Sequence, residues 1–339
     1  MERFTHILGV SAALVAIAVF SGCGGGSSSG NNKPVPTDKI AFASSRSGAF
    51  QIYIMNIDGS SQTALTSFSG TSADTTIAPK VSLSPKLADG SRMVAFDYPD
   101  PSQNSQSELW LVKTDTTGIK PNGQPQRLFT GNDAFADTSP SWSPDGTKLA
   151  FVRSDTSGSG TQPAVYMVGI QTLSSPVKEV ENGDSPCWMM DNRNIAYVSY
   201  EDGFANIYAH DTSMGVAGNN SQLTLFAFDA NMGIDSIAYY DNIFVFSTYE
   251  TNGATPGQIY SVDSGIAATV PGHLLGDTIQ NQYDDAGPGW TTDGRIVYFS
   301  GPNSGSSYDI YIMNADGTGR KQLTTSGDNG FPSSRTRRR

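Results

Sequence analysis

The sequence predicts an all-β fold, a six-bladed β-propeller with four-stranded blades, from two observations: an internal repeat and a composition suited to strands and turns. The chain has 339 residues, with 36 Gly, 14 Tyr and 16 Phe, and only 16% of its residues are charged. Aromatic residues favour strands, and glycine favours the turns between them. Two cysteines cannot cross-link a chain of this length, so a disulfide-dense scaffold is excluded.

The repeat is clearest near the two ends of the chain. The segment 52–59, Ile-Tyr-Ile-Met-Asn-Ile-Asp-Gly, returns at 310–317 with seven of eight residues identical. Each copy is followed, six residues after its glycine, by Leu-Thr. A repeat spaced by tens of residues is typical of stacked units that cannot bury their hydrophobic faces alone.

A short apolar strand that contains an aromatic residue occurs six times, at spacings of 53, 56, 46, 48 and 53 residues. A polar, glycine-rich loop and a second strand follow each copy, which predicts a hairpin. One short segment before most hairpins and another after them complete four strands, and six such units predict a propeller. The six copies lie at 40–43, 93–96, 149–152, 195–198, 243–246 and 296–299.

The two ends of the repeat region are predicted to share one blade. The first unit begins directly at Ile40, without the segment that precedes most of the other hairpins, and 329–334 resembles that missing strand. Pairing between these two segments would close the ring by main-chain hydrogen bonds. Closure would also remove open sheet edges, which otherwise invite aggregation.

The first 37 residues are predicted to lie outside the propeller. Residues 1–22 combine an N-terminal positive charge with an apolar run from 7 to 20, which is typical of a secretory signal peptide and short for a membrane span. Residues 23–37 are rich in Gly, Ser and Pro and form a tether. We therefore expect the propeller to span 38–334 and a basic tail to span 335–339.

The four residues 20–23, Phe-Ser-Gly-Cys, resemble the lipobox of bacterial lipoproteins. The resemblance implies that Cys23 is acylated and becomes the first residue of the mature chain. The alternative is a lone cysteine beside an ordinary cleavage site. Gly24, rather than Asp, follows the cysteine, and in the sorting pattern of Gram-negative lipoproteins this implies the outer membrane. We therefore expect a protein that is anchored by lipid in the cell envelope.

The repeat itself resembles that of the TolB family, whose propeller repeat is similar to WD40. The resemblance is carried by Trp-Ser-Pro-Asp-Gly at 142–146 and by the repeated block at 52–59 and 310–317. It covers nearly all of the chain after residue 38, and it implies a fold rather than a function. The second unit departs from it, with Leu-Ser-Pro at 83–85, and the fifth has no clear Pro-x-Trp. Residues 23–38 are too few for the α/β domain of TolB, so we expect a TolB-like propeller and not TolB.

Aspartates recur shortly before the first strand of several units. In a propeller these connections run to the mouth of the central channel, so the repeat would gather the carboxylates into a ring. Such a ring could hold a hard cation such as Ca²⁺ or attract a basic segment of a partner. The alternative is that each aspartate caps its own turn. The candidate binding residues are Asp74, Asp137, Asp184, Asp284, Asp285 and Asp328.

The sequence contains no motif that predicts catalysis. The mature chain has two histidines, His210 and His273, in different units and without the spacing of zinc ligands. Neither is accompanied by a nucleophile motif in a strand–turn–helix context. A net charge of −11 argues against nucleic acid as a partner. We therefore expect no catalytic residues, no firm metal site and no required cofactor, with Ca²⁺ at the channel mouth as the one candidate.

The expected function is that of a lipid-anchored binding or scaffold protein of the cell envelope. Its propeller, expected to be monomeric, would present one face to a protein or to an envelope polymer. The alternative is a propeller-based hydrolase or lyase that acts on an extracytoplasmic substrate. That alternative requires polar residues along the channel that turn chemistry does not explain.

Overall fold

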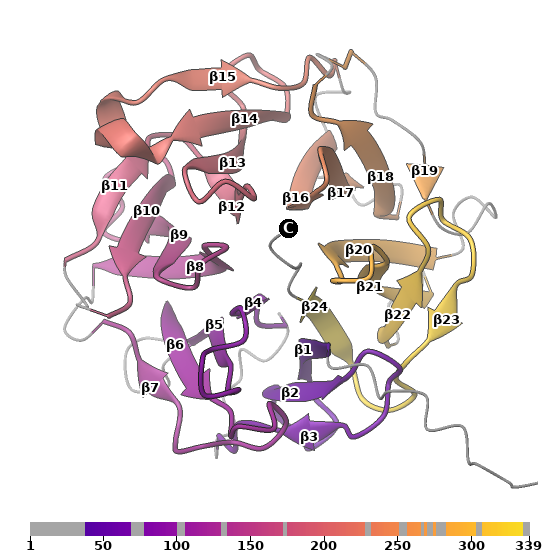
Figure 1. The fold of residues 1–339 in the computed structure, drawn as a ribbon. Coiled ribbons are helices and arrows are strands. Elements are labelled where there is room, and N and C mark those ends of the chain that lie inside the picture. The colour runs from indigo at the N-terminus through magenta and orange to yellow at the C-terminus, as the bar shows by residue number, and fades with distance from the viewer. Residues whose placement is uncertain are drawn as a thin grey trace, which may run out of the picture. The chain divides into compact units, whose positions relative to one another are not determined.

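The described residues form six four-stranded antiparallel sheets that follow one another around a central axis, as Figure 1 shows. The predicted all-β, six-bladed propeller is confirmed, and it lies within the unit Pro36–Arg339. The predicted signal peptide, the tether with Cys23 and the basic tail lie outside the described residues. This computed structural model describes residues 38–68, 78–99, 106–129, 134–171, 175–227, 232–250, 256–265, 268–269, 274–275, 283–302 and 307–334.

Within each blade the strands are ordered from the channel outward. Blade 1 contains β24 (Asn329–Ser334), β1 (Lys39–Ser44), β2 (Gln51–Asn56) and β3 (Thr63–Ala64). Blade 2 contains β4 (Val81–Leu83), β5 (Met93–Pro99), β6 (Ser107–Lys113) and β7 (Gln126–Arg127). Blade 3 contains β8 (Phe135–Trp142), β9 (Lys148–Asp155), β10 (Ala164–Gly169) and β11 (Val177–Val180).

The other three blades repeat this order. Blade 4 contains β12 (Asp184–Trp188), β13 (Asn194–Ser199), β14 (Asn206–Asp211) and β15 (Asn220–Gln222), with the short 3₁₀ helix η1 (Thr212–Ala217) between the last two. Blade 5 contains β16 (Met232–Tyr240), β17 (Ile243–Glu250), β18 (Gln258–Asp263) and β19 (Leu274–Leu275). Blade 6 contains β20 (Tyr283–Trp290), β21 (Ile296–Pro302), β22 (Asp309–Met313) and β23 (Lys321–Gln322).

The two ends of the described propeller meet in blade 1, which confirms the predicted closure. β24 pairs with β1, so that Ile40 lies opposite Ser334 and Ala43 lies opposite Gly330. A side chain reinforces the joint, because Arg46 donates a hydrogen bond of 3.1 Å to the amide oxygen of Asn329. The ring is therefore held by backbone pairing between segments almost 300 residues apart.

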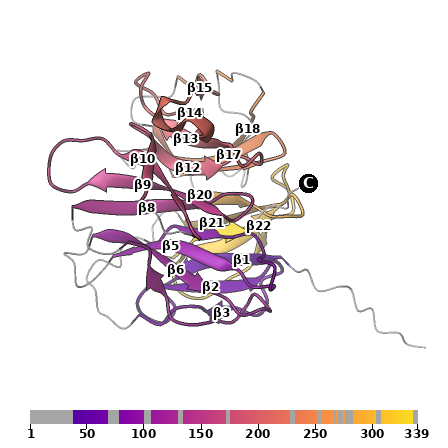
Figure 2. The same ribbon diagram turned by 60° about the vertical axis from the view of Figure 1, so that its left-hand side comes forward.

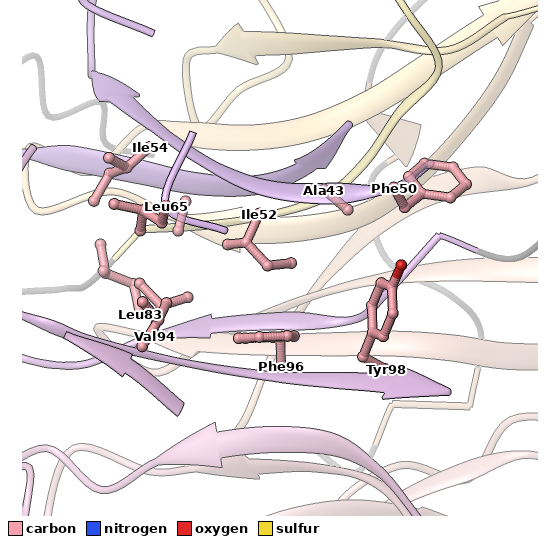
Figure 3. Close-up of a cluster of buried hydrophobic side chains, with 11 residues drawn as sticks. Ala43, Phe50, Ile52, Ile54, Leu65, Leu83, Val94, Phe96 and Tyr98 are labelled. Atoms are coloured by element: carbon pink, nitrogen blue, oxygen red, sulfur yellow. The ribbon is translucent and has the colours of Figure 1, made fainter. Parts of the chain in front are cut away.

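The hydrophobic core is divided into six clusters, one at each interface between neighbouring blades. The strand β2 has apolar or aromatic side chains on both of its faces. Ile52 and Ile54 face blade 2, whereas Tyr53 and Met55 face blade 6. Side chains alternate across a strand, so a strand between two blades needs apolar residues on both faces. Figure 2 shows the neighbouring sheets face to face, and Figure 3 shows the cluster between blades 1 and 2.

The aromatic residues that mark the repeat form stacked pairs between the second and third strands of five blades. Their ring centroids lie 5.7–6.0 Å apart. In three of these blades an arginine lies over the pair, as Arg320 does at 4.5 Å from the centroid of Tyr311. The aromatic part of the repeat is therefore structural. The pairs are Phe42–Tyr53, Phe151–Tyr166, Tyr197–Tyr208, Phe246–Tyr260 and Tyr298–Tyr311.

Two further sequence features have structural roles in the described residues. The repeated Asp-Gly pairs close turns: Gly59 has a φ of +91°, and the Asp58 carboxylate accepts a hydrogen bond from the backbone N–H of Ser60. Cys187 lies half-buried in β12 and lines the channel. No helix in the described part of the chain has the length and apolar character needed to span a bilayer.

Candidate functional site

The inner strands bend sharply where they line the channel. In five of the six blades the pairing between the inner strand and its neighbour is broken by a bulge. In four of them a residue directly before a proline has a positive φ: Ser139, Ser185, Gly287 and Phe331, with φ from 44° to 59°. This conformation is unfavourable for residues other than glycine, and bulges commonly re-aim side chains near functional sites.

Two cavities lie along the channel. The inner one has a volume of about 150 Å³ and is lined by residues from all six inner strands. The second lies at the mouth and has a volume of about 440 Å³. Lys80 is the single cationic side chain among the described residues that line this mouth. The acidic and tyrosine side chains that line it are Asp184, Asp235, Asp284, Asp328, Tyr200, Tyr249 and Tyr308.

Asp284 is held in place by two donors. Its Oδ1 accepts a hydrogen bond of 2.6 Å from the backbone N–H of Gly257, and its Oδ2 accepts one of 2.7 Å from the Tyr308 hydroxyl. Both contacts depend on glycine, because a Cβ at Gly257 would lie 2.6 Å from Oδ1 and a Cβ at Gly301 would lie 2.7 Å from the Tyr308 ring. Burial and the neighbouring Asp284 raise the pKa of Tyr308, so its hydroxyl remains a donor.

Asp184 and Asp328 accept backbone hydrogen bonds and also line the mouth. Asp184 accepts a hydrogen bond from the backbone N–H of Ser185, and Asp328 accepts one of 3.0 Å from the backbone N–H of Tyr308. For Asp184 this is the turn-capping role that was the alternative to ligand binding. The two roles are compatible, since a carboxylate has about four lone-pair positions.

Tyr200 and Tyr249 form an exposed part of the rim. Their hydroxyl groups lie 3.3 Å apart, and the two side chains are 46% and 40% exposed. The Tyr249 ring packs against Gly233, where a Cβ would lie 2.3 Å from it. Partial burial, together with Tyr249 and Asp184, raises the pKa of Tyr200. The rim therefore offers aromatic surface beside carboxylates.

Asp137 and Asp285 lie elsewhere. Asp137 is 3% exposed and forms two hydrogen bonds of 2.7 Å with the guanidinium of Arg153. Asp285 is 2% exposed and lies 3.6 Å from the guanidinium of Arg320. Side chains alternate along a strand, so Asp284 faces the mouth while Asp285 faces into the blade. The remaining candidate, Asp74, lies outside the described residues.

The structure adds residues that sequence reasoning missed. Lys80 comes just before β4, and Asp235 occupies the bulge of β16, an inner strand without a Pro-x-Trp. Their side chains meet in an ion pair of 3.4 Å. Tyr308 precedes the repeated block of blade 6 by two positions. Its proximity to the repeat was the only available signal for Tyr308. The Lys80–Asp235 pair gave no signal, because pairing across a channel leaves no local pattern.

Asp97 is a buried carboxylate behind the mouth. It accepts hydrogen bonds from the backbone N–H groups of Lys80 at 2.7 Å and Ser139 at 2.9 Å, so it ties blade 2 to blade 3. Burial raises its pKa to about 6, although the two backbone donors and the ammonium of Lys80 act in the opposite direction. Asp97 therefore positions Lys80 and does not itself line the cavity.

The described residues contain no group of three or more His, Cys, Asp and Glu side chains arranged to hold a metal ion. Calcium at the mouth stays a prediction, since Asp74 lies outside the described ranges. His210 is fully buried: its Nδ1 lies 2.8 Å from the Asn220 side-chain oxygen, and its Nε2 lies 3.4 Å from Glu179. His273 lies outside the described residues.

Comparisons with known proteins agree on the fold. No family model matches the chain. A TolB homologue from Chlorobium luteolum is 29% identical over 165 residues, which is 39% of this chain and only 34% of that protein. The putative TolB of Agrobacterium tumefaciens has a TM-score of 0.52 at 18% identity, over 86% of this chain and 91% of that one. A puromycin-hydrolyzing peptidase of Mycobacterium tuberculosis has a TM-score of 0.50 at 11% identity, over 86% and 48%. The chain has a TolB-like propeller, a fold that binding proteins and enzymes share.

Proposed function

We propose that this chain is a binding or scaffold protein of the cell envelope, and that the mouth of its propeller binds a basic segment of a protein partner. The mouth carries this proposal. Four carboxylates and three tyrosines line a cavity of about 440 Å³, in which Lys80 is the one described cation. A cavity of this size accommodates a few side chains rather than a folded domain.

Charge favours a cationic ligand. The chain has a net charge of −11, and carboxylates that line a concave surface focus their field into it. Asp284 and Asp328 are already fixed by hydrogen bonds, so binding would cost little side-chain entropy at these positions. The exposed rings of Tyr200 and Tyr249 can also pack against the alkyl stem or the charge of a lysine or arginine.

The envelope location and the lipid anchor rest on different support. The similarity to a TolB homologue supports an envelope protein, and the lipobox-like segment at 20–23 supports acylation of Cys23 and the outer membrane. Replacing Cys23 by Ser should release the chain from the membrane fraction and abolish labelling by radioactive palmitate. A Cys23→Ser chain that still sediments with the outer membrane would contradict the anchor.

Crosslinking in intact cells tests the binding function. A photoreactive amino acid at position 200, on the rim, should give a protein adduct that is lost on Asp184→Asn and Asp328→Asn. The matched control is the same amino acid at position 177, which is 53% exposed on the outer strand β11. Protein adducts that form equally well in the Asp184→Asn and Asp328→Asn variants would contradict the proposal. A polymer adduct would instead identify an envelope polymer as the ligand, and a cleaved product would favour the hydrolase or lyase alternative.

A further inference from the structure

A hydrogen bond of the Lys80 backbone N–H orients this residue toward the channel. It lies directly before β4, and its backbone N–H donates to Asp97 of the next strand, β5. Asp97 also accepts from Ser139 in blade 3 and is 7% exposed. The start of the Lys80 side chain is therefore fixed by a buried carboxylate that joins two blades.

The ammonium group of Lys80 reaches the opposite side of the ring. Its Nζ lies 3.4 Å from Oδ1 and 3.3 Å from the main-chain oxygen of Asp235 in β16. Figure 1 shows β4 and β16 on opposite sides of the central axis. The same Nζ lies 5.5 Å from the centroid of the Phe331 ring, in β24. Asp184 is close enough to contribute to the electrostatic stabilisation of the protonated lysine.

This contact lies where the two cavities meet. Lys80, Asp235 and Phe331 line both the mouth and the inner channel, and so does Ser185, whose hydroxyl donates to the main-chain oxygen of Asp235. The Lys80 side chain thus lies between the mouth and the inner cavity. The position it occupies already meets the requirements of an alkylammonium ion, namely a carboxylate, a carbonyl oxygen and an aromatic face.

We propose that Asp235 and the Phe331 ring form a subsite for a primary ammonium group, which Lys80 fills in the free protein and which a lysine side chain of the bound segment takes over. This inference rests on the proposed function and adds the chemistry of one contact to it. Displacement of Lys80 would open the mouth into the inner channel, so the bound segment could enter further.

The ion pair is weak enough to exchange. The side chains of Lys80 and Asp235 are 28% and 31% exposed, and they meet through one contact of 3.4 Å. Partly exposed pairs of this kind contribute about fivefold or less to an equilibrium constant. An incoming ammonium group with additional contacts at the rim can therefore displace Lys80, whereas a fully buried pair could not be opened so readily.

Chemical complementation tests the subsite with the full chain. Lys80→Ala removes the propylammonium part of the side chain, so added n-propylammonium should bind this variant at least tenfold more tightly than it binds the wild type. Binding should be lost in Lys80→Ala/Asp235→Asn. The matched control is Lys113→Ala, which breaks another lysine–aspartate pair, the surface pair with Asp89, and should gain no binding. Calorimetry at constant ionic strength gives the affinities.

A second variant keeps the test valid if Lys80→Ala does not fold. Lys80→Met retains an apolar stem without the charge, and it should bind a tetralysine peptide at least fivefold more tightly than the wild type. If neither variant gains affinity, or if Asp235→Asn has no effect on the gain, the subsite is overturned.

Wild-type binding of tetralysine that depends on Asp184 and Asp328 would then still support the proposed function. Propylammonium binding to Lys80→Ala without any tetralysine binding to the wild type would support the subsite and contradict the proposed function.

Discussion

The arginine–aromatic clusters inside the blades and the mouth of the channel both combine a carboxylate, a cation and aromatic rings, but they differ in how far these groups are buried. In blade 3, the side chains of Asp137 and Arg153 are 4% and 10% exposed and form two hydrogen bonds, and the Arg153 guanidinium lies against four aromatic rings. At the mouth, the side chains of Asp235 and Lys80 are about one third exposed and make one contact with each other. A carboxylate, a cation and an aromatic ring therefore stabilise the fold when they are buried together. The same groups form a candidate binding site when they line a cavity.

The largest expected effect comes from breaking the closed cluster. Arg153→Ala should lower the free energy of unfolding by about 3–5 kcal/mol, because it leaves the buried Asp137 carboxylate without its cation. Urea unfolding measures the change. The matched control is Arg193→Ala, since the Arg193 side chain is 61% exposed in its pair with Asp211, and it should leave stability nearly unchanged. Equal effects of the two variants would remove the distinction between closed and open pairs.

A smaller effect should appear at Asp97, between the two regions. Its folded pKa of about 6 lies above the unfolded value of about 3.9, so the folded state retains a proton that the unfolded state has lost. The contribution of Asp97 to stability therefore falls as the pH rises from about 4 to 6, and it stays low above that range. Asp97→Asn cannot ionise, so relative to the wild type it should gain about 2–3 kcal/mol between pH 4 and pH 7.

Denaturant titrations of both proteins across that pH range check this prediction. The difference between them is informative because other carboxylates titrate equally in both. A difference that does not change between pH 4 and pH 7 would mean that the Asp97 carboxylate is ionised throughout, with its pKa at or below the usual range.

The smallest effect is expected for the open pair. Lys80→Met should change the free energy of unfolding by less than about 1 kcal/mol, because the Lys80 and Asp235 side chains are partly exposed and meet through one contact. The same urea experiment measures it. A loss comparable to that of Arg153→Ala would show that Lys80 supports the fold, and the comparison between closed and open pairs would then need revision.

Much of the fold could be predicted because its causes are local. A strand packed between two blades must be apolar on both faces, so 40–43 and its five copies stand out, and the Asp-Gly turns mark the hairpins. The candidate site was less predictable. Asp184, Asp284 and Asp328 line the mouth, but Asp285, adjacent to one of them, is buried in the blade.

The number of blades, the hairpins and the closure of the ring follow from the amino-acid sequence alone, because periodic apolar strands and turn residues act over a few positions. Which carboxylates share a cavity, and that Lys80 contacts Asp235, became visible in the assembled propeller. These two residues are 155 positions apart and belong to opposite blades. Their contact depends on ring closure and on bulges in the inner strands, which place side chains relative to a channel that exists only after all six blades have assembled.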